Sequence, residues 1–196
     1  MGNITNCKAI TFVDVETTNL DPKKSAILQI SIITDWKDDK QEVWTTKIKP
    51  RKMEMEFASS DALKICKYDP KEWEDAPYFE DIAETIVSKL TWGPIVAHNI
   101  QFDMSHLSAS LVRRGWKSAK NFQRSDVKNK IFKFGYPLID TCALAYLFLP
   151  TQKQNLNALR EHFNLSTEHA HTADGDVNDC RSIFYSIIMS LEKKNE

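Results

Sequence analysis

An apolar stretch of β-strand character ends in two carboxylates at Phe12-Val13-Asp14-Val15-Glu16-Thr17-Thr18. Successive side chains of a strand point to opposite faces, so Asp14 and Glu16 share one face, with their Cα atoms roughly 7 Å apart. Two like charges this close are costly to bury unless a cation or hydrogen-bond donors compensate them. The stretch therefore predicts a metal site at the end of a strand, although an isolated Asp-x-Glu also fits a strand that runs into a solvated loop.

Length and composition predict one domain without a membrane segment. The 196 residues, 42% of them hydrophobic, can bury one good core, so we expect a single domain over residues 1–196. The 26 basic and 27 acidic residues nearly cancel, and the net charge of -1 neither indicates nor excludes a nucleic-acid partner. The four cysteines lie far apart in sequence, which indicates neither a zinc site nor disulfides. No stretch is typical of a signal peptide or a membrane span, so we expect a reducing, cytoplasmic location and no membrane partner.

The hydrophobic pattern predicts an α/β fold. After the first strand, residues 26–33 form a nearly continuous apolar strand and residues 42–49 an alternating one, which indicates three antiparallel strands in succession. Strands at 95–98 and 137–140 are each followed directly by a helical pattern. The expected helices are a short one ending at Cys66, one from near Pro77 through Leu90, those at 99–114, 141–149 and 156–163, and a last one beginning near Asp176. An antiparallel start followed by strand-helix alternation predicts a mixed sheet with helices on both faces.

Two more aspartates lie at helix starts, on the apolar rather than the polar stripe. Asp103 precedes Leu107 and Leu111, and Asp176 precedes Cys180 and Ile183, at helical spacing. Either one alone is typical of a helix-start residue that the helix dipole favours. Two of them beside a strand-end Asp-x-Glu predict that four carboxylates converge.

Four carboxylates with no Cys or His at ligand spacing favour Mg²⁺ or Mn²⁺. Two such ions stabilise the attacking and leaving oxygens in an in-line phosphodiester displacement. A general base is then expected near Asp176, and His169 and His171 compete, since His169 to Asp174 and His171 to Asp176 have the same separation. Asp174 lies on the polar side of its helix and Asp176 on the apolar stripe, so His171 is the predicted base; an imidazole titrates near neutrality and suits that role.

A basic segment lies between Arg113 and Lys133 and contains Lys120, Arg124 and Lys128. It also carries three aromatic residues, Trp116, Phe122 and Phe132. The segment fits a solvated loop. It equally fits a basic arm whose cations contact phosphates while its aromatic rings stack on bases.

Three motifs together resemble those of the DnaQ-like (DEDD) 3′-5′ exonucleases, in the subgroup with a catalytic His. They are Asp14-Val15-Glu16-Thr17-Thr18, His98-Asn99-Ile100-Gln101-Phe102-Asp103 and His171-Thr172-Ala173-Asp174-Gly175-Asp176. The resemblance implies a ribonuclease-H-like fold: a mixed, five-stranded sheet with three antiparallel strands first, flanked by helices on both faces. Two positions depart from the family pattern. Asn19 replaces a usual Gly, where we expect a left-handed turn that Asn tolerates, and Gln29 replaces a Glu often found in the second strand.

The resemblance also implies roles for individual residues. Asp14, Glu16, Asp103 and Asp176 would hold two divalent cations, and His171 would activate the attacking water. The implied substrate-binding residues are Thr17, Thr18, Leu20, His98, Asn99 and Phe102, with Thr17 beside the terminal 3′-hydroxyl and Leu20 against the terminal bases. Lys120, Arg124 and Lys128 remain candidates for phosphate contacts.

The expected activity is release of nucleoside 5′-monophosphates from the 3′ ends of single-stranded DNA or frayed duplexes, in proofreading or repair. The same chemistry on RNA is the nearer alternative, because no motif shows whether a 2′-hydroxyl is accepted. A catalytically silent nucleic-acid-binding module is an alternative from another class, but it would normally have lost a metal ligand or the His. No polymerase region is recognised, so proofreading would need a polymerase or repair complex in trans.

Overall fold

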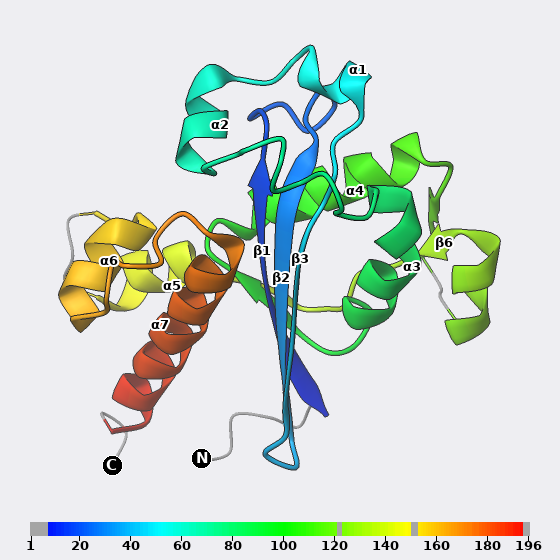
Figure 1. The fold of residues 1–196 in the computed structure, drawn as a ribbon. Helices are drawn as coiled ribbons and strands as arrows, with labels where there is room; N and C mark the ends of the chain where they lie inside the picture. The colour runs from blue at the N-terminus through cyan, green and yellow to red at the C-terminus, as the bar shows by residue number, and fades with distance from the viewer. Residues whose placement is uncertain (1–7, 121–122, 150–152, 194–196) are drawn as a thin grey trace.

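The structure is a computed structural model that describes residues 8–120, 123–149 and 153–193. Its centre is a five-stranded sheet in the order β3-β2-β1-β4-β7 (Figure 1). The strands are β1 (Ala9–Thr17), β2 (Ile27–Trp36), β3 (Gln41–Lys47), β4 (Ile95–Ala97) and β7 (Leu138–Asp140). β1 pairs antiparallel with β2 and β2 with β3, whereas β1–β4 and β4–β7 are parallel. The predicted mixed sheet with three antiparallel strands first is confirmed.

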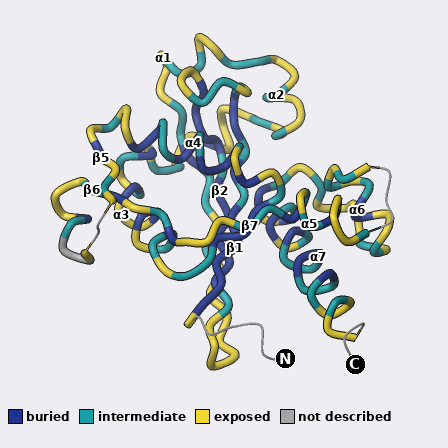
Figure 2. The backbone as a smooth tube through the Cα atoms, turned by 180° about the vertical axis from the view of Figure 1, so that it is seen from behind, coloured by how far each residue is buried: buried dark blue, intermediate teal, exposed yellow. Residues whose placement is uncertain are grey.

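Helices lie on both sides of this sheet, as predicted. They are α1 (Lys52–Met55), α2 (Ser60–Ile65), α3 (Phe79–Lys89), α4 (Ile100–Arg113), α5 (Thr141–Phe148), α6 (Leu156–Phe163) and α7 (Ala173–Lys193). Figures 1 and 2 show α3 and α4 on one side and α5, α6 and α7 on the other. Within the described residues no helix is both long and apolar enough to span a membrane.

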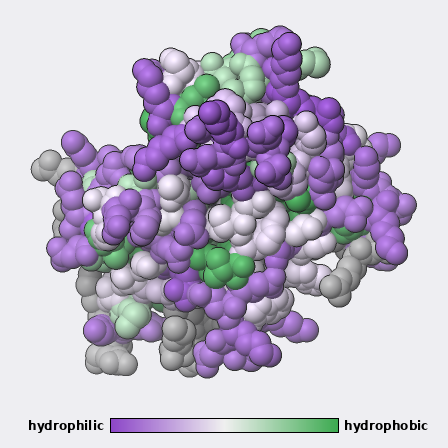
Figure 3. Space-filling model, in the orientation of Figure 1, coloured by the Kyte–Doolittle hydropathy of each residue, from purple (hydrophilic) through white to green (hydrophobic). Residues whose placement is uncertain are grey.

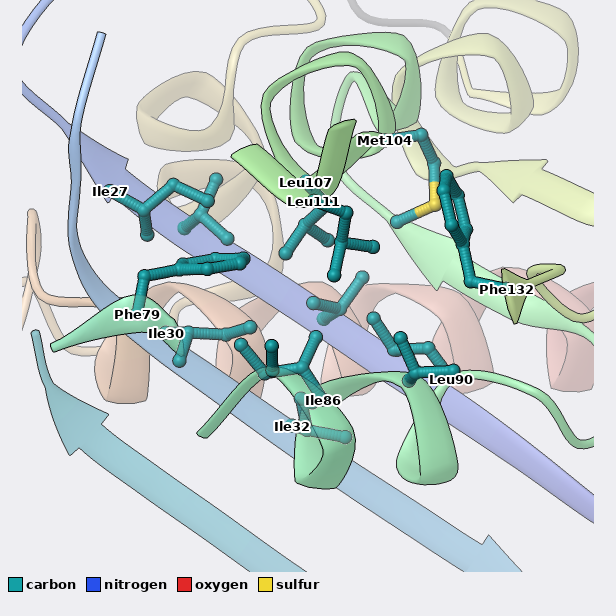
Figure 4. Packing of buried hydrophobic residues seen from close by; sticks show 14 of the residues in the cluster. Ile27, Ile30, Ile32, Phe79, Ile86, Leu90, Met104, Leu107, Leu111 and Phe132 are labelled. Atoms are coloured by element: carbon teal, nitrogen blue, oxygen red, sulfur yellow. The ribbon is translucent and has the colours of Figure 1, made fainter. Parts of the chain in front are cut away.

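β1 divides the core between these two sides because its side chains alternate. Val13 and Val15 belong to the cluster that α3 and α4 cover, which Figure 4 shows for neighbouring residues such as Ile86 and Leu107. Phe12 belongs to the opposite cluster, and its ring lies 5.6 Å from that of Phe184 on α7. Asp14 and Glu16 continue the face of Phe12, so the strand itself directs both carboxylates toward the α7 side.

The described part of the segment between α4 and β7 contains three short regular elements. It contains β5 (Lys117–Ser118), the 3-10 helix η1 (Arg124–Asn129) and β6 (Ile131–Phe132), with β5 and β6 paired in parallel. Trp116 and Phe132 are buried in the α3–α4 cluster, so the alternative in which these two rings stack on bases is wrong: their faces pack against apolar neighbours. Phe122 lies outside the described residues. Neither these short elements nor α1 was predicted, because so few residues carry little periodicity.

The face of the molecule seen in Figure 1 is predominantly polar. Figure 3 shows hydrophilic residues over most of that face, and Figure 2 shows exposed residues at the tip of the β2–β3 hairpin.

Candidate metal centre

The carboxylates of Asp14, Glu16 and Asp176 meet near the end of β1 and the first turn of α7. Figure 1 shows α7 beginning beside β1. One carboxylate oxygen from each of the three residues lies within 4.8 Å of those of the other two, and all three side chains are half-buried. Separations of this size allow one cation to contact all three residues. Strand alternation supplies the first two groups and the helix start supplies the third.

Asp103 approaches the same strand end from α4. Its side chain is only 2% exposed, and its Oδ1 accepts a hydrogen bond from the Val15 N–H at 3.1 Å. Asp103 is not one of the three residues that meet within 4.8 Å. Three of the four predicted ligands therefore lie close enough together to share one cation. The fourth, Asp103, is hydrogen-bonded to the β1 backbone.

The site is electrostatically strained in a way that a cation relieves. Burial raises the pKa of the Asp14 carboxyl well above its usual range, and the charges of Asp103, Asp176 and Glu16 raise it further. Burial also raises the pKa of Glu16 and that of Asp103. In the described part of the chain no donor hydrogen-bonds to the Asp14 carboxylate. A desolvated carboxylate without donors, beside other carboxylate oxygens, suits a hard divalent cation.

His171 lies beside this cluster on the loop that leads into α7. Its backbone is left-handed, with φ at 63°, and its N–H donates to Asp176 Oδ1 at 3.0 Å. The imidazole is exposed, and a positive charge on it lowers the pKa of both Glu16 and Asp176. Gly175 lets the loop pack this tightly, because a Cβ at that position would lie 2.1 Å from the His169 carbonyl oxygen. The arrangement places an imidazole next to the carboxylates, at the edge open to solvent.

The sequence matches the model of a protein family described as exonuclease, RNase T, over residues 11–184. The chain belongs to this exonuclease family. The match confirms the predicted DnaQ-like resemblance.

This chain is similar to proteins of which it covers very different shares. The 3′-5′ exonuclease DinG of Bacillus subtilis is 27% identical over 190 residues, which cover 96% of this chain and 18% of DinG. Ribonuclease T of Buchnera aphidicola is 28% identical, over 90% of this chain and 81% of its own length. The DNA polymerase III subunit epsilon of Treponema pallidum is 25% identical, over 95% of this chain and 80% of its own. The chain thus spans less than a fifth of the DinG relatives.

Solved exonuclease structures share the fold. Exonuclease I of E. coli in complex with a dT13 oligonucleotide superposes with a TM-score of 0.71 at 17% identity, over 92% of this chain and 40% of that one. A zinc-bound exonuclease I–single-stranded DNA complex also gives 0.71, at 16% identity, over 96% of this chain and 42% of that one. The ribonuclease-H-like fold is thereby confirmed for this exonuclease-family chain.

The predicted substrate-binding residues differ in how exposed they are. Leu20 is 82% exposed, and the turn that carries it is tied to α4 by a contact of 3.1 Å between His106 Nε2 and the Asn19 carbonyl oxygen. Asn99 is exposed in a left-handed conformation at the start of α4, and its N–H donates to Asp140 Oδ1. Both residues are accessible beside the ends of β1 and β4.

The other four predicted substrate residues are more enclosed. Phe102 and His98 are half-buried, and His98 Nδ1 lies 3.0 Å from Thr141 Oγ1. Thr17 is buried, and its hydroxyl donates to the Asn19 carbonyl. Thr18 is fully buried with its hydroxyl accepting the Ala26 N–H, so its side chain holds the turn and leaves no surface for substrate.

The two residues that depart from the family pattern, Asn19 and Gln29, both make side-chain hydrogen bonds to the backbone. Asn19 is not left-handed, so that expectation is wrong. Its side chain accepts the Asp21 N–H and donates to the Phe57 carbonyl, which closes the turn in another way. Gln29 Oε1 accepts the N–H of Ala173 at the start of α7.

The basic residues of the 113–133 segment lie away from the cluster. Lys120 and Lys128 are exposed, and Figures 1 and 2 place β5, η1 and β6 on the α3 side, whereas α7 lies on the other side of the sheet. The side chain of Arg124 is outside the described part. Phosphate contacts by these residues remain a prediction.

Two contacts to the carboxylates were not anticipated. Cys66, just after α2, donates from Sγ to Glu16 Oε2 at 3.1 Å, and burial together with the Glu16 charge raises the pKa of this thiol. Arg160 of α6 donates from Nη2 to Asp176 Oδ1 at 2.6 Å. A lone Cys and a polar residue on an amphipathic helix carry no signal of such partners, because both contacts depend on how distant elements pack.

Proposed function

We propose that this chain is a metal-dependent 3′-5′ exonuclease that releases nucleoside 5′-monophosphates from single-stranded or frayed DNA 3′ ends. The observation that carries the proposal is the meeting of Asp14, Glu16 and Asp176 within 4.8 Å at the end of β1. Membership of the exonuclease family supports the reaction class.

The residues divide the chemistry between them. Asp14, Glu16 and Asp176, with Asp103 behind them, would hold two divalent cations, Mg²⁺ or Mn²⁺, which when bound stabilise the charges on the attacking and leaving oxygens. His171 takes the proton from the attacking water at the solvent-open edge of the cluster. The backbone beside Thr17 meets the terminal 3′-hydroxyl, and the exposed Leu20 lies against the terminal base. Phe102 and Asn99 shape the groove at the start of α4.

DNA is the proposed substrate, because exonuclease I, which shares the fold, is seen bound to DNA oligonucleotides. RNA is the second candidate, favoured by the similarity to ribonuclease T over 90% of this chain. The similarity to a DNA polymerase III epsilon subunit supports a polymerase as a partner in trans.

The test uses 5′-labelled DNA and RNA oligonucleotides of the same sequence, single-stranded and duplex, incubated with Mg²⁺, Mn²⁺ or EDTA. We expect a ladder that shortens from the 3′ end of single-stranded DNA, requires metal, and disappears in Asp14→Asn. Asp174→Asn, an exposed carboxylate on the same turn of α7 as Asp176, is the matched control and should retain activity. A faster ladder on RNA would reassign the substrate, and full activity in EDTA or in Asp14→Asn would overturn the mechanism.

A further inference from the structure

Arg160 is an unusual residue to find on α6. Its side chain is 0% exposed and is among the largest fully buried side chains of the described chain. A guanidinium keeps its charge at any physiological pH, so burying it is costly unless acceptors surround it. Three acceptor side chains surround this guanidinium and compensate its charge.

The guanidinium of Arg160 donates three hydrogen bonds to side chains of α6 and α7. Nε donates to Asp179 Oδ2 at 2.6 Å and Nη2 to Asp176 Oδ1 at 2.6 Å, so one edge of the guanidinium joins two carboxylates one turn apart on α7. Nη1 donates to Asn157 Oδ1 at 2.7 Å within α6. The planar fork is thereby anchored on its own helix, and the position of Asp176 is coupled to α6.

The oxygen that Arg160 binds also holds the His171 loop. Asp176 Oδ1 accepts both the Arg160 fork and the backbone N–H of His171, at 2.6 and 3.0 Å. Among described residues no donor reaches the other oxygen, Oδ2. One oxygen of Asp176 is therefore held from two directions, while the second has no described donor and is free to bind a cation.

We propose that Arg160 is a positioning residue that locks Asp176 in its cation-binding orientation and, through the shared oxygen, holds the His171 loop beside the cluster. The inference rests on the proposed function. It assigns to α6, which contributes none of the predicted ligands, a part in assembling the centre.

The charge of Arg160 makes the proposal testable. Its charge and its positioning role have opposite effects on the affinity of the site for a divalent cation. A cation beside the carboxylates repels a bound divalent ion, so if Arg160 were only a counter-charge, removing it would tighten metal binding. If Arg160 positions Asp176, removing it releases the carboxylate and weakens metal binding, by about 10- to 100-fold for residues that orient ligands. Lysine keeps the charge, but its ammonium group cannot donate the two parallel hydrogen bonds that one edge of the guanidinium makes.

The experiment measures Mn²⁺ binding by isothermal titration calorimetry, with kcat and KM on a 5′-labelled oligonucleotide and the unfolding midpoint in EDTA. The variants are Arg160→Met and Arg160→Lys. Arg181→Met is the matched control, because it removes another ion pair of α7, to Asp35 at 2.7 Å, without touching the cluster.

We expect both Arg160 variants to raise the Mn²⁺ dissociation constant at least about 10-fold and to lower kcat, with KM changed less than about threefold. Arg181→Met should shift the unfolding midpoint only. Arg160→Lys keeps a buried cation beside Asp176 and Asp179, so it carries the test if Arg160→Met does not fold.

Unchanged or tighter Mn²⁺ binding in Arg160→Lys or in folded Arg160→Met would overturn the inference. If wild-type protein binds Mn²⁺ and shortens the oligonucleotide while both Arg160 variants match it, the inference alone fails. If wild-type protein does neither, the proposed function fails, and the positioning role fails with it.

Discussion

The first turns of α4 and α7 each bring an aspartate to the end of β1, and the two aspartates are held by different means. Asp103 is buried and accepts a backbone N–H of β1. Asp176 is half-buried and accepts a guanidinium from α6 and the N–H of His171. A backbone donor is present whatever side chains the strand carries, whereas Arg160 is one replaceable side chain. Asp103 is therefore held by the backbone of β1, whereas Asp176 is held by a side chain of a third helix and by a tight loop.

The comparison predicts unequal effects of removing each charge. Asp176→Asn should lower kcat about 10³-fold, because it removes the charge of a proposed metal ligand from the group that meets within 4.8 Å. Asp103→Asn should fold normally, since an amide oxygen can still accept the Val15 N–H, and should weaken Mn²⁺ binding less than Asp176→Asn. Calorimetric Mn²⁺ titration and single-turnover kinetics measure both. Stronger loss of metal affinity in Asp103→Asn would reverse the assigned order.

The next largest expected loss of activity comes from a substitution in the loop before α7. His171→Asn, which suits the left-handed backbone at φ 63°, should lower kcat about 10²-fold. Mn²⁺ affinity should be unchanged, because the contact to Asp176 comes from the backbone N–H. His169→Asn is the control and should keep wild-type kcat. Equal losses in the two variants would remove the distinction between the histidines.

Packing of that loop against α7 should be visible as stability. Gly175→Ala places a Cβ 2.1 Å from a carbonyl oxygen, so the free energy of unfolding should fall by about 1–3 kcal/mol. That cost exceeds the gain of roughly 1 kcal/mol that Ala normally brings to a helix interior. Urea unfolding measures it, with Asn178→Ala on the exposed face of α7 as control. A stabilised Gly175→Ala would show that the loop moves freely.

The smallest expected effect concerns pH without metal. The pKa values of Asp14 and Asp103 are raised in the folded chain by burial and by neighbouring charges. Between the unfolded Asp value of about 3.9 and these raised values the folded state binds more protons, so stability should rise as pH falls through the window. In EDTA at pH 7, Asp14→Asn should raise the unfolding midpoint by about 2–4 °C and reduce its pH dependence. A wild-type midpoint that falls as the solution is acidified from neutral pH would contradict the like-charge repulsion.

The main elements were predictable because their signals are local. β2, with burial on both faces, and α4 and α6 follow from runs of apolar residues and from caps such as Asn155, which accepts the Ala158 N–H. The basic segment was not, because the burial of Trp116 and Phe132 depends on α3 and α4 packing over them. Asn19 was predicted in the wrong backbone conformation, because its side-chain bond to the Phe57 carbonyl closes the turn across a long sequence separation.

The sequence by itself determined the mixed sheet, the shared face of Asp14 and Glu16, and the placement of Asp103 and Asp176 on apolar helix stripes, because strand and helix periodicities act over a few residues. Only the tertiary structure decided that Asp103 bonds to β1 instead of joining the other three carboxylates, that Thr18 holds a turn, and that Arg160 and Cys66 contact the carboxylates of Asp176 and Glu16. These contacts join residues far apart in the chain, and their existence depends on how whole elements pack, which no local pattern records.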